Sequence, residues 1–268
     1  MTQTRIVILG CGSSGGVPRI GNDWGVCDPS NPKNRRSRCG LFVEIKKAGE
    51  APFRLLIDTA PDLREQLIRN EIRDVDCVLY THTHADQCHG IDDLRVLAYL
   101  QRAQMPIYGM QSTLDELNER FGYCFNRPSG SPYPPILNAK PPIVANKRFT
   151  AEGASGGSVE VLPLDQDHGS VRSLGFRIGN FAYCNDVVDL PEETLARLEG
   201  LDLFIVDALR YDPHPTHAHV EKSLGWIERI KPKRAILTNL HVDVDYEQLG
   251  RELPDTVEPA YDGMEVII

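Results

Sequence analysis

The sequence contains no apolar segment long enough for a membrane-spanning helix. Such helices need about 18 or more consecutive apolar residues, and no run of that length occurs in the 268 residues. The first residues, 1–5, lead directly into a short apolar run at residues 6–9. This run is shorter than the apolar region of a secretory signal. We therefore expect a cytoplasmic protein with no membrane partner.

The sequence also lacks paired cysteines and an excess of basic charge. Its seven cysteines are odd in number and widely scattered, whereas a disulfide framework usually has an even number at regular spacings. Lysine and arginine number 29 against 38 aspartates and glutamates, which gives a formal net charge of −9. Because an enzyme that grips a long nucleic acid usually has a broad basic face, this charge favours a small anionic substrate over a polymer.

No internal repeat, low-complexity tract or flexible linker interrupts the chain. Short apolar runs alternate with amphipathic stretches, which predicts a layered α/β architecture in one domain spanning residues 1–268. The expected strands are residues 5–9, 41–45, 54–57, 77–80, 159–162, 175–178, 181–184, 203–206, 235–237 and 265–267. The expected helices are residues 61–69, 92–101, 112–121, 192–198, 219–230 and 246–253. Residues 127–142 are rich in proline, glycine and serine, so we expect an ordered surface loop or lid there.

All eight histidines lie at or after position 82, and the first two belong to the most informative segment of the chain. His82, His84 and Asp86 follow an apolar run at residues 75–80 that predicts a buried strand. Two imidazoles two residues apart on extended backbone point the same way and can bind one cation. The carboxylate of Asp86 can hold a second ion or orient a water molecule. The alternative is a polar loop whose histidines form only local hydrogen bonds.

Two further candidate ligands follow other predicted strands. His168 comes after the expected strand at residues 159–162, and Asp186 comes after the strand at residues 181–184. Loops at the ends of several strands can converge on one site. Together with His82 and His84 they would supply three imidazoles and one carboxylate, a set that suits Zn²⁺ or Mn²⁺.

These motifs resemble the metallo-β-lactamase superfamily, whose hallmark is H-x-H-x-D-H, and the resemblance covers nearly the whole chain. Asp58, after an early predicted strand, matches the superfamily's structural aspartate. The glycine- and serine-rich segment at residues 9–18 and the segment at residues 214–217 are most similar to PhnP-type cyclic phosphodiesterases, with tRNase Z a more distant relative. The resemblance implies a four-layer αββα sandwich with metal ions at one edge of its two sheets.

The chain departs from the family pattern at Gln87 and Asn239, where the family has histidines that ligate a second metal ion together with the aspartates that match Asp86 and Asp186. An amide oxygen is a weaker ligand than an imidazole. We therefore expect one firm metal site and a second site that is weak or absent. His241 could replace Asn239 as a ligand, or it could be a surface residue.

The same resemblance implies a catalytic role for His217, which would donate a proton to the leaving oxygen of a phosphate ester. An imidazole suits that role because its pKa lies near neutrality. His219 is the rival proton donor. Asp86 would orient the attacking water or help to hold a second ion.

Two further segments are candidates for binding phosphate. The glycine-rich loop around Ser13 and Ser14 can present backbone amides to an anion. The basic run that contains Arg35, Arg36 and Arg38 can supply guanidinium groups for a bidentate grip. This run could equally be a solvated loop.

The combined interpretation is a metal-dependent phosphodiesterase that acts on a small cyclic or nucleotide-like phosphodiester. The metal ion would polarise a phosphoryl oxygen and lower the pKa of a bound water. Two alternatives remain open: a nucleotide-binding protein with a degenerate second metal site, and a tRNase Z-like endonuclease. A homodimer is compatible with the sequence.

Overall fold

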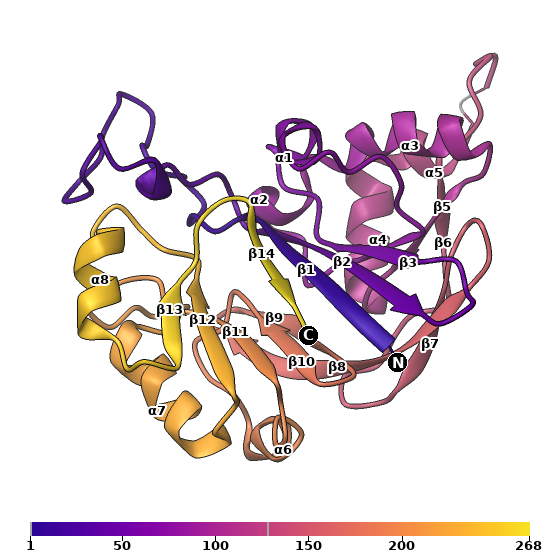
Figure 1. Ribbon diagram of the computed structural model, residues 1–268. Helices are drawn as coiled ribbons and strands as arrows, with labels where there is room; N and C mark the ends of the chain where they lie inside the picture. The colour runs from indigo at the N-terminus through magenta and orange to yellow at the C-terminus, as the bar shows by residue number, and fades with distance from the viewer. Residues whose placement is uncertain (1, 128) are drawn as a thin grey trace.

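Two seven-stranded β-sheets pack face to face in the computed structural model, which describes residues 2–127 and 129–268 (Figure 1). In the order β14-β1-β2-β3-β4-β5-β6, the strands of the first sheet are Met264–Ile267, Thr2–Gly10, Gly40–Lys47, Phe53–Ile57, Cys77–Leu79, Met105–Tyr108 and Leu137–Ala139. In the order β13-β12-β11-β10-β9-β8-β7, those of the second sheet are Val257–Pro259, Arg234–Thr238, Leu203–Asp207, Phe181–Cys184, Val171–Ile178, Ser158–His168 and Phe149–Glu152.

Both sheets are mixed in the same way. From β14 to β3 the first sheet is antiparallel, and from β3 to β6 it is parallel. From β7 to β10 the second sheet is antiparallel, and from β10 to β13 it is parallel. Because the parallel strands within each sheet run in one direction, their carboxyl ends lie along one edge of that sheet. The loops that follow strands of the two sheets meet there.

Strand β11 illustrates why the apolar runs form central strands. All five of its residues are buried, because a parallel strand inside a layered fold has no solvent-facing side. Leu203 and Ile205 face the core between the two sheets. Phe204 and Val206 face the core beneath the outer helices, as expected from the two-residue period of a strand.

Helices cover the outer face of each sheet (Figure 1). Those beside the first sheet are α1 (Leu63–Arg69), α3 (Leu94–Gln101), α4 (Gln111–Arg120) and α5 (Gly122–Phe125). Those beside the second sheet are α6 (Glu192–Ala196), α7 (Val220–Ile230) and α8 (Tyr246–Glu252). The short helices are α2 (Ala85–Cys88), η1 (Pro32–Asn34) and η2 (Ile91–Asp93). The four-layer αββα sandwich is thus confirmed. Among the described residues, no helix has the length and apolarity needed to cross a membrane.

The sequence analysis did not predict four short strands, β5, β6, β7 and β13. Strand β6 lies inside the segment 127–142 that we expected to be a loop, and residue 128 of that segment lies outside the described residues. Strands of three or four residues give too short a pattern to recognise, and both β5 and β13 contain a proline, a residue usually depleted in strands.

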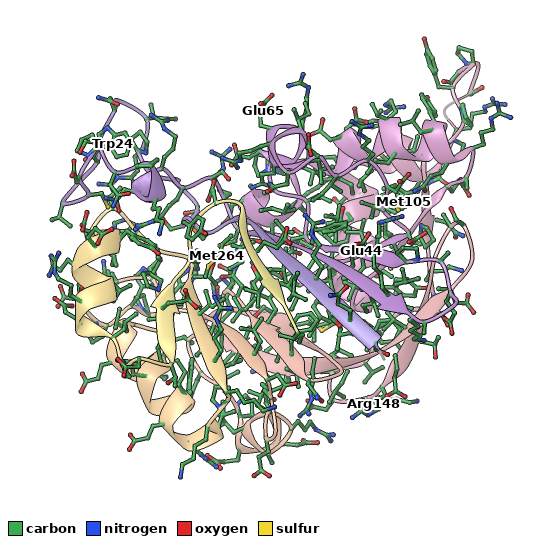
Figure 2. The ribbon with its side chains drawn as sticks, viewed as in Figure 1. Trp24, Glu44, Glu65, Met105, Arg148 and Met264 are labelled. Carbon is green, nitrogen blue, oxygen red and sulfur yellow. The ribbon has the colours of Figure 1, made fainter. Side chains whose placement is uncertain are left out.

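A long excursion, residues 11–39, connects β1 to β2 and crosses to the second sheet. Figure 2 shows Trp24 on this excursion, on the opposite side of the view from Met105 in β5. The amide of Leu240, just after β12, donates a hydrogen bond to the carbonyl of Cys11 at 2.8 Å. The excursion therefore connects the first sheet to the ends of the strands of the second sheet. Its first residues form one wall of a cavity there.

Candidate metal centre and active site

A cavity of about 410 Å³ opens at the edge where the carboxyl ends of strands from both sheets meet. It is lined by Ser13, Ser14, Gly15, Arg19, His84, Asp86, His168, Asp186, Leu209, Arg210, His214, Thr216, His217 and His241. These residues come from the excursion after β1 and from the ends of β4, β8, β10, β11 and β12. The convergence of strand ends that the sequence predicted is therefore present.

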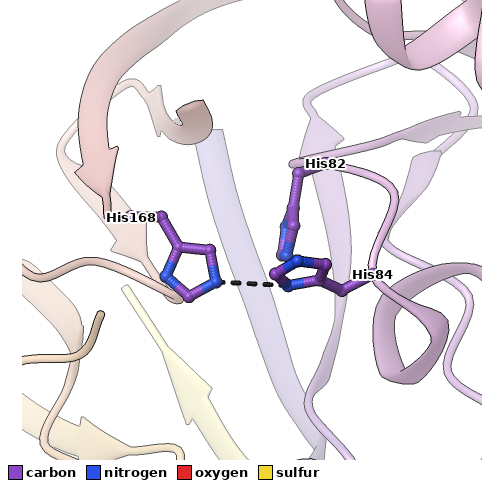
Figure 3. Close-up of side chains that lie close together, drawn as sticks. All are labelled: His82, His84 and His168. Carbon is purple, nitrogen blue, oxygen red and sulfur yellow. Dashed lines mark hydrogen bonds between the residues drawn. The ribbon is translucent and has the colours of Figure 1, made fainter. Parts of the chain in front are cut away.

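Three histidines lie close together at this site (Figure 3). His82 and His84 extend from the loop after β4, and His168 faces them from the end of β8. Their ligand nitrogens lie within 4.8 Å of one another, and Nε2 of His168 lies 3.2 Å from Nδ1 of His84. The sequence placed His168 in a loop, but it is the last residue of β8, because the polar side chains of Asp165 and Asp167 alternate outward while the strand continues.

Hydrogen bonds fix the orientation of His82. The buried carboxylate of Asp58 accepts a hydrogen bond from Oγ1 of Thr81 at 2.8 Å. Since that hydroxyl has one proton to give, it accepts the Nδ1 proton of His82, 2.9 Å away. The Nε2 atom of His82 is then unprotonated, and it is buried without a hydrogen-bond partner. An orphaned buried nitrogen aimed at two other imidazoles is the arrangement that a metal ion satisfies.

A backbone contact orients His168 in the same manner. Its Nδ1 donates to the carbonyl of Thr216 at 2.7 Å, so Nε2 faces His84 with its lone pair. Burial lowers the pKa of His168 to about 4, and burial together with His84 and His168 lowers the pKa of His82 well below its usual value. These imidazoles are therefore neutral at neutral pH, which is the form that binds a metal ion.

Asp186, at the end of β10, is the carboxylate beside this group. Its side chain is buried and accepts a hydrogen bond from the amide of Asn185 at 2.7 Å. Burial, with the neighbouring carboxylate of Asp86, raises the pKa of Asp186 well above its ordinary value. A bound divalent cation would relieve that penalty. The donors present thus fit one divalent ion of intermediate softness.

The two positions at which the sequence departs from the family pattern form hydrogen bonds. The Gln87 amide donates to the Asp86 carboxylate at 3.1 Å. The Asn239 amide lies 3.1 Å from Nδ1 of His217. Both side chains are buried beside the site. Within the described chain, two groups of side chains have ligand atoms within 4.8 Å of one another: His82, His84 and His168 form one, and His168, Asp186 and His217 form the other.

His217 is held by a carboxylate that the sequence analysis did not identify. Asp207, fully buried at the end of β11, lies 2.8 Å from Nδ1 of His217. Burial alone would lower the pKa of His217, but the charge and hydrogen bond of Asp207, with Asp186 and Asp86, raise it to about 9. The signal for Asp207 was present in the sequence, because an acidic residue directly after an apolar run is the pattern that identified Asp58.

The other histidines lie at or beyond the rim of the cavity. His214 lines the cavity, and its ring lies 5.2 Å from that of His217. His219 occupies the N-cap position of α7 and does not line the cavity, whereas His217 does. His241 bonds Asp243 through Nδ1 at 2.8 Å, and it does not belong to either group of potential ligands.

The basic run before β2 does not reach the cavity. Arg35 is exposed and stacks on Trp24, with its guanidinium 5.2 Å from the ring. Arg36 is buried and donates to backbone carbonyls. Arg38 pairs with Asp62 at 3.0 Å. The expectation that these three arginines line a phosphate site was therefore wrong, because a charge run in the sequence does not show which residues fold inward.

Arg19 and Arg210 are the arginines that line the cavity, and the sequence analysis had not selected either. Ser13 and Ser14, which it had selected, also line it. Ser13 is buried and begins a turn in which its carbonyl accepts the amide proton of Gly16 at 2.8 Å. The serine and arginine side chains that line the cavity thus come from the beginning of the excursion and from the loop after β11.

Comparison with known proteins agrees with this geometry. A family model described as a beta-lactamase superfamily domain matches residues 53–239. A solved structure described as a new diphosphatase from the PhnP family is 33% identical and has a TM-score of 0.87, and the match covers 100% of this chain and 98% of that one. The short form of human tRNase Z is 16% identical over 98% of both chains with a TM-score of 0.63, which shows the shared fold alone.

An octanoyltransferase from Porphyromonas gingivalis is 33% identical over 98% of this chain and 51% of its own length. This chain therefore spans about half the length of that relative. The family model, the PhnP-family structure and the histidine site confirm the resemblance inferred from the motifs. The chain belongs to the PhnP family of metal-dependent hydrolases with the metallo-β-lactamase fold.

Proposed function

We propose that the protein is a phosphodiesterase that hydrolyses a small cyclic or nucleotide-like phosphodiester with one bound divalent metal ion. The observation that supports this most strongly is that three imidazoles whose ligand nitrogens lie within 4.8 Å of one another adjoin a cavity lined by a fourth imidazole, which a buried aspartate holds. A bound ion supplies Lewis acidity toward a phosphoryl oxygen and activates water. His82, His84, His168 and Asp186 would hold it.

His217 would protonate the leaving oxygen. Because Asp207 occupies Nδ1 of His217, Nε2 is the nitrogen available to a substrate in the cavity. General acid catalysis of this kind contributes about 10²- to 10⁴-fold to a rate. Asp86 would orient the attacking water, and the loop at Ser13 and Ser14 would hold the phosphoryl group.

A diphosphate is the second candidate substrate, because the PhnP-family relative is described as a diphosphatase. Both linkages present a phosphoryl group and a leaving oxygen, so the same residues would serve either. Initial rates on thymidine 5′-(p-nitrophenyl phosphate) and on diadenosine diphosphate, compared at equal concentration, distinguish the two. The substrate with the much higher initial rate contains the preferred linkage.

Acyl transfer, suggested by the name of the octanoyltransferase relative, fits the cavity less well. Among the residues that line it, Leu209 is the single large apolar side chain, whereas an eight-carbon chain would need an apolar channel. A nucleotide-binding protein without activity would bind nucleotide but release no product with any metal. A tRNase Z-like endonuclease would bind tRNA with a steep dependence on salt.

The first test is hydrolysis of bis-p-nitrophenyl phosphate by metal-free protein titrated with manganese and with zinc. We expect release of p-nitrophenol that saturates near one ion per chain. His82→Ala should lose both metal binding and activity, because it removes the nitrogen that is buried without another partner. Activity retained in His82→Ala would refute the assignment.

A matched pair of variants tests the proton donor. His217→Ala should bind metal as the wild type does but hydrolyse adenosine 2′,3′-cyclic phosphate, whose leaving alkoxide needs a proton, about 10²-fold more slowly or worse. His219→Ala is the control, because His219 lies two residues away and outside the cavity. Equal rates for the two variants would remove His217 from the mechanism.

A further inference from the structure

Thr83 lies between two of the proposed metal ligands, His82 and His84, but its side chain is held from the other side of the loop after β4. The rings of His82 and His84 lie on one side of this loop, with their centroids 4.5 Å apart (Figure 3). Successive side chains of an extended backbone point to opposite sides, and the backbone at His84 is extended, with φ −60° and ψ 149°. Thr83 does not line the cavity. The contacts that hold Thr83 therefore act on both imidazoles from outside the cavity.

Two side chains of α4 form hydrogen bonds with Thr83. The hydroxyl of Thr83 donates to the Glu116 carboxylate at 2.5 Å, and the carbonyl of Thr83 accepts a hydrogen bond from Nη1 of Arg120 at 2.7 Å. Each bond includes an ionised group, and such bonds are about twice as strong as neutral ones. Since Leu114 and Leu117 are buried in the core between the first sheet and its helices, these bonds connect the loop after β4 to a firmly packed helix.

Glu116 and Arg120, which we call the α4 pair, also orient each other. They are four residues apart, so they are neighbours on one face of α4, and Nη2 of Arg120 pairs with Oε1 of Glu116. The other atoms, Oε2 of Glu116 and Nη1 of Arg120, bond Thr83. Because both side chains of the pair are 40% exposed, solvent screens their attraction, which adds little to stability. The effect of the pairing is to set the direction in which the two groups point.

His84 is the proposed ligand that depends most on this support. The rings of His82 and His168 are oriented by the hydrogen bonds of their Nδ1 atoms. Within residues 2–127 and 129–268, the ring of His84 has no hydrogen bond besides its contact with His168, and His84 is exposed. The position of its ring beside the other two imidazoles therefore depends on the backbone that the α4 pair holds.

We propose that Glu116 and Arg120 are positioning residues, which hold the loop after β4 through Thr83 and so place His84 before a metal ion binds. The proposal rests on the metal site of the proposed function but not on its substrate. Ligands that are already in place lose little freedom on binding, and residues that support metal ligands from outside typically contribute about 10- to 100-fold to metal affinity. The α4 pair therefore raises the affinity for the ion without contacting the ion or the substrate.

A matched pair of substitutions at Thr83 tests the proposal. Thr83→Val keeps the shape of the side chain and removes the hydroxyl, whereas Thr83→Ser keeps the hydroxyl. We expect Thr83→Val to bind Co²⁺ about 10-fold more weakly than the wild type, measured by competition with a chelator, and Thr83→Ser to bind it as the wild type does. The visible absorption of the bound cobalt depends on ligand geometry, so it should change in Thr83→Val and match the wild type in Thr83→Ser.

Variants of α4 test the same contacts from the other side. Arg120→Gln and Glu116→Leu should each weaken cobalt binding. Thr83→Val combined with Glu116→Leu should bind no more weakly than Glu116→Leu alone, because both substitutions remove the same hydrogen bond. Glu119→Gln is the control, because Glu119 is exposed on the same helix, and it should bind cobalt as the wild type does.

Wild-type cobalt affinity in both Thr83→Val and Arg120→Gln would overturn the proposal, and so would additive losses in the double variant. A wild-type protein that binds no cobalt would overturn the metal site itself, and the proposal with it. Circular dichroism of the metal-free variants confirms that each is folded. Arg120 is exposed, so Arg120→Gln decides the test even if a substitution at Thr83 disturbs the loop.

Discussion

Asp207→Asn tests how the protein holds its proposed general acid. The substitution keeps the shape of the side chain but removes the negative charge 2.8 Å from Nδ1 of His217. Asp207 is fully buried, so no water replaces the lost charge. Burial then remains as the dominant influence on the pKa of His217, and it acts downward.

The size of the effect follows from the two protonation equilibria. With a pKa of about 9, about 90% of His217 is protonated at pH 8, whereas with the ordinary value of 6.5 only about 3% is. The fraction able to donate a proton therefore falls about 30-fold at pH 8 but less than about 1.5-fold at pH 6. The loss of activity in Asp207→Asn should grow as the pH rises.

The pH profile of kcat/KM on adenosine 2′,3′-cyclic phosphate, whose leaving alkoxide needs a proton, measured from pH 5.5 to 9.5 in the wild type and Asp207→Asn, is the primary assay. We expect the basic limb of the variant to lie at lower pH. An NMR titration of His217 in the metal-free proteins locates the same pKa directly. Parallel profiles, with the variant slower by a constant factor, would refute the reasoning.

The same pKa shift predicts a pH dependence of stability. Because the folded-state pKa of His217 lies above its ordinary value of 6.5, protonation stabilises the fold fully below pH 6.5, and this contribution is lost as the pH rises through about 9. It amounts to about 3 kcal/mol for the metal-free protein. Urea unfolding at pH 6 and pH 9.5 should show a larger loss for the wild type than for Asp207→Asn.

Further predictions concern the metal site and the core. Replacing both Gln87 and Asn239 with histidine should raise the zinc content from one ion per chain toward two, measured by elemental analysis; a content still near one would show that more than these ligands is missing. Removing the metal with dipicolinate should lower the unfolding free energy by about 4 kcal/mol when the free ion had been at 1,000 times its Kd, seen as a lower melting temperature. Arg36→Met should destabilise the fold by about 2–4 kcal/mol, because it removes the charged hydrogen bonds that the buried guanidinium donates to the carbonyls of His241 and Val244, whereas a neutral result in urea would mean that water replaces the guanidinium. Ile205→Ala should cost about 2–5 kcal/mol, since Ile205 is fully buried between the sheets, and a change below 1 kcal/mol would contradict that packing.

The central strands and the proposed metal ligands were selected from the sequence for the same physical reason. A strand buried on both faces is an unbroken apolar run, as in Phe204–Val206 of β11. The ligand that follows such a run stands out by polarity, as His82 and Asp186 do. Asp207 follows the same rule and could have been selected by it, but only the structure shows the contact with His217 that gives this aspartate a role.

The arginines show where prediction from sequence stops. Arg36 and Arg210 are equally charged, and the first lies within an obvious basic run while the second stands alone. Only the path of the chain buries Arg36 under the loop after β12 and turns Arg210 toward the cavity. Tertiary hydrogen bonds to backbone carbonyls have no sequence pattern, so the composition of the rim could not be predicted.

The proposed ligands divide between the two sheets, so a bound metal ion would connect the two halves of the chain. The first sheet would contribute two imidazoles, His82 and His84, and the second would contribute His168 and Asp186. Neither half has enough donors to hold the ion alone. Metal content therefore reports whether the halves are correctly docked. Chelation should loosen their alignment before it disturbs either sheet, and a small slip of one sheet against the other should release the ion.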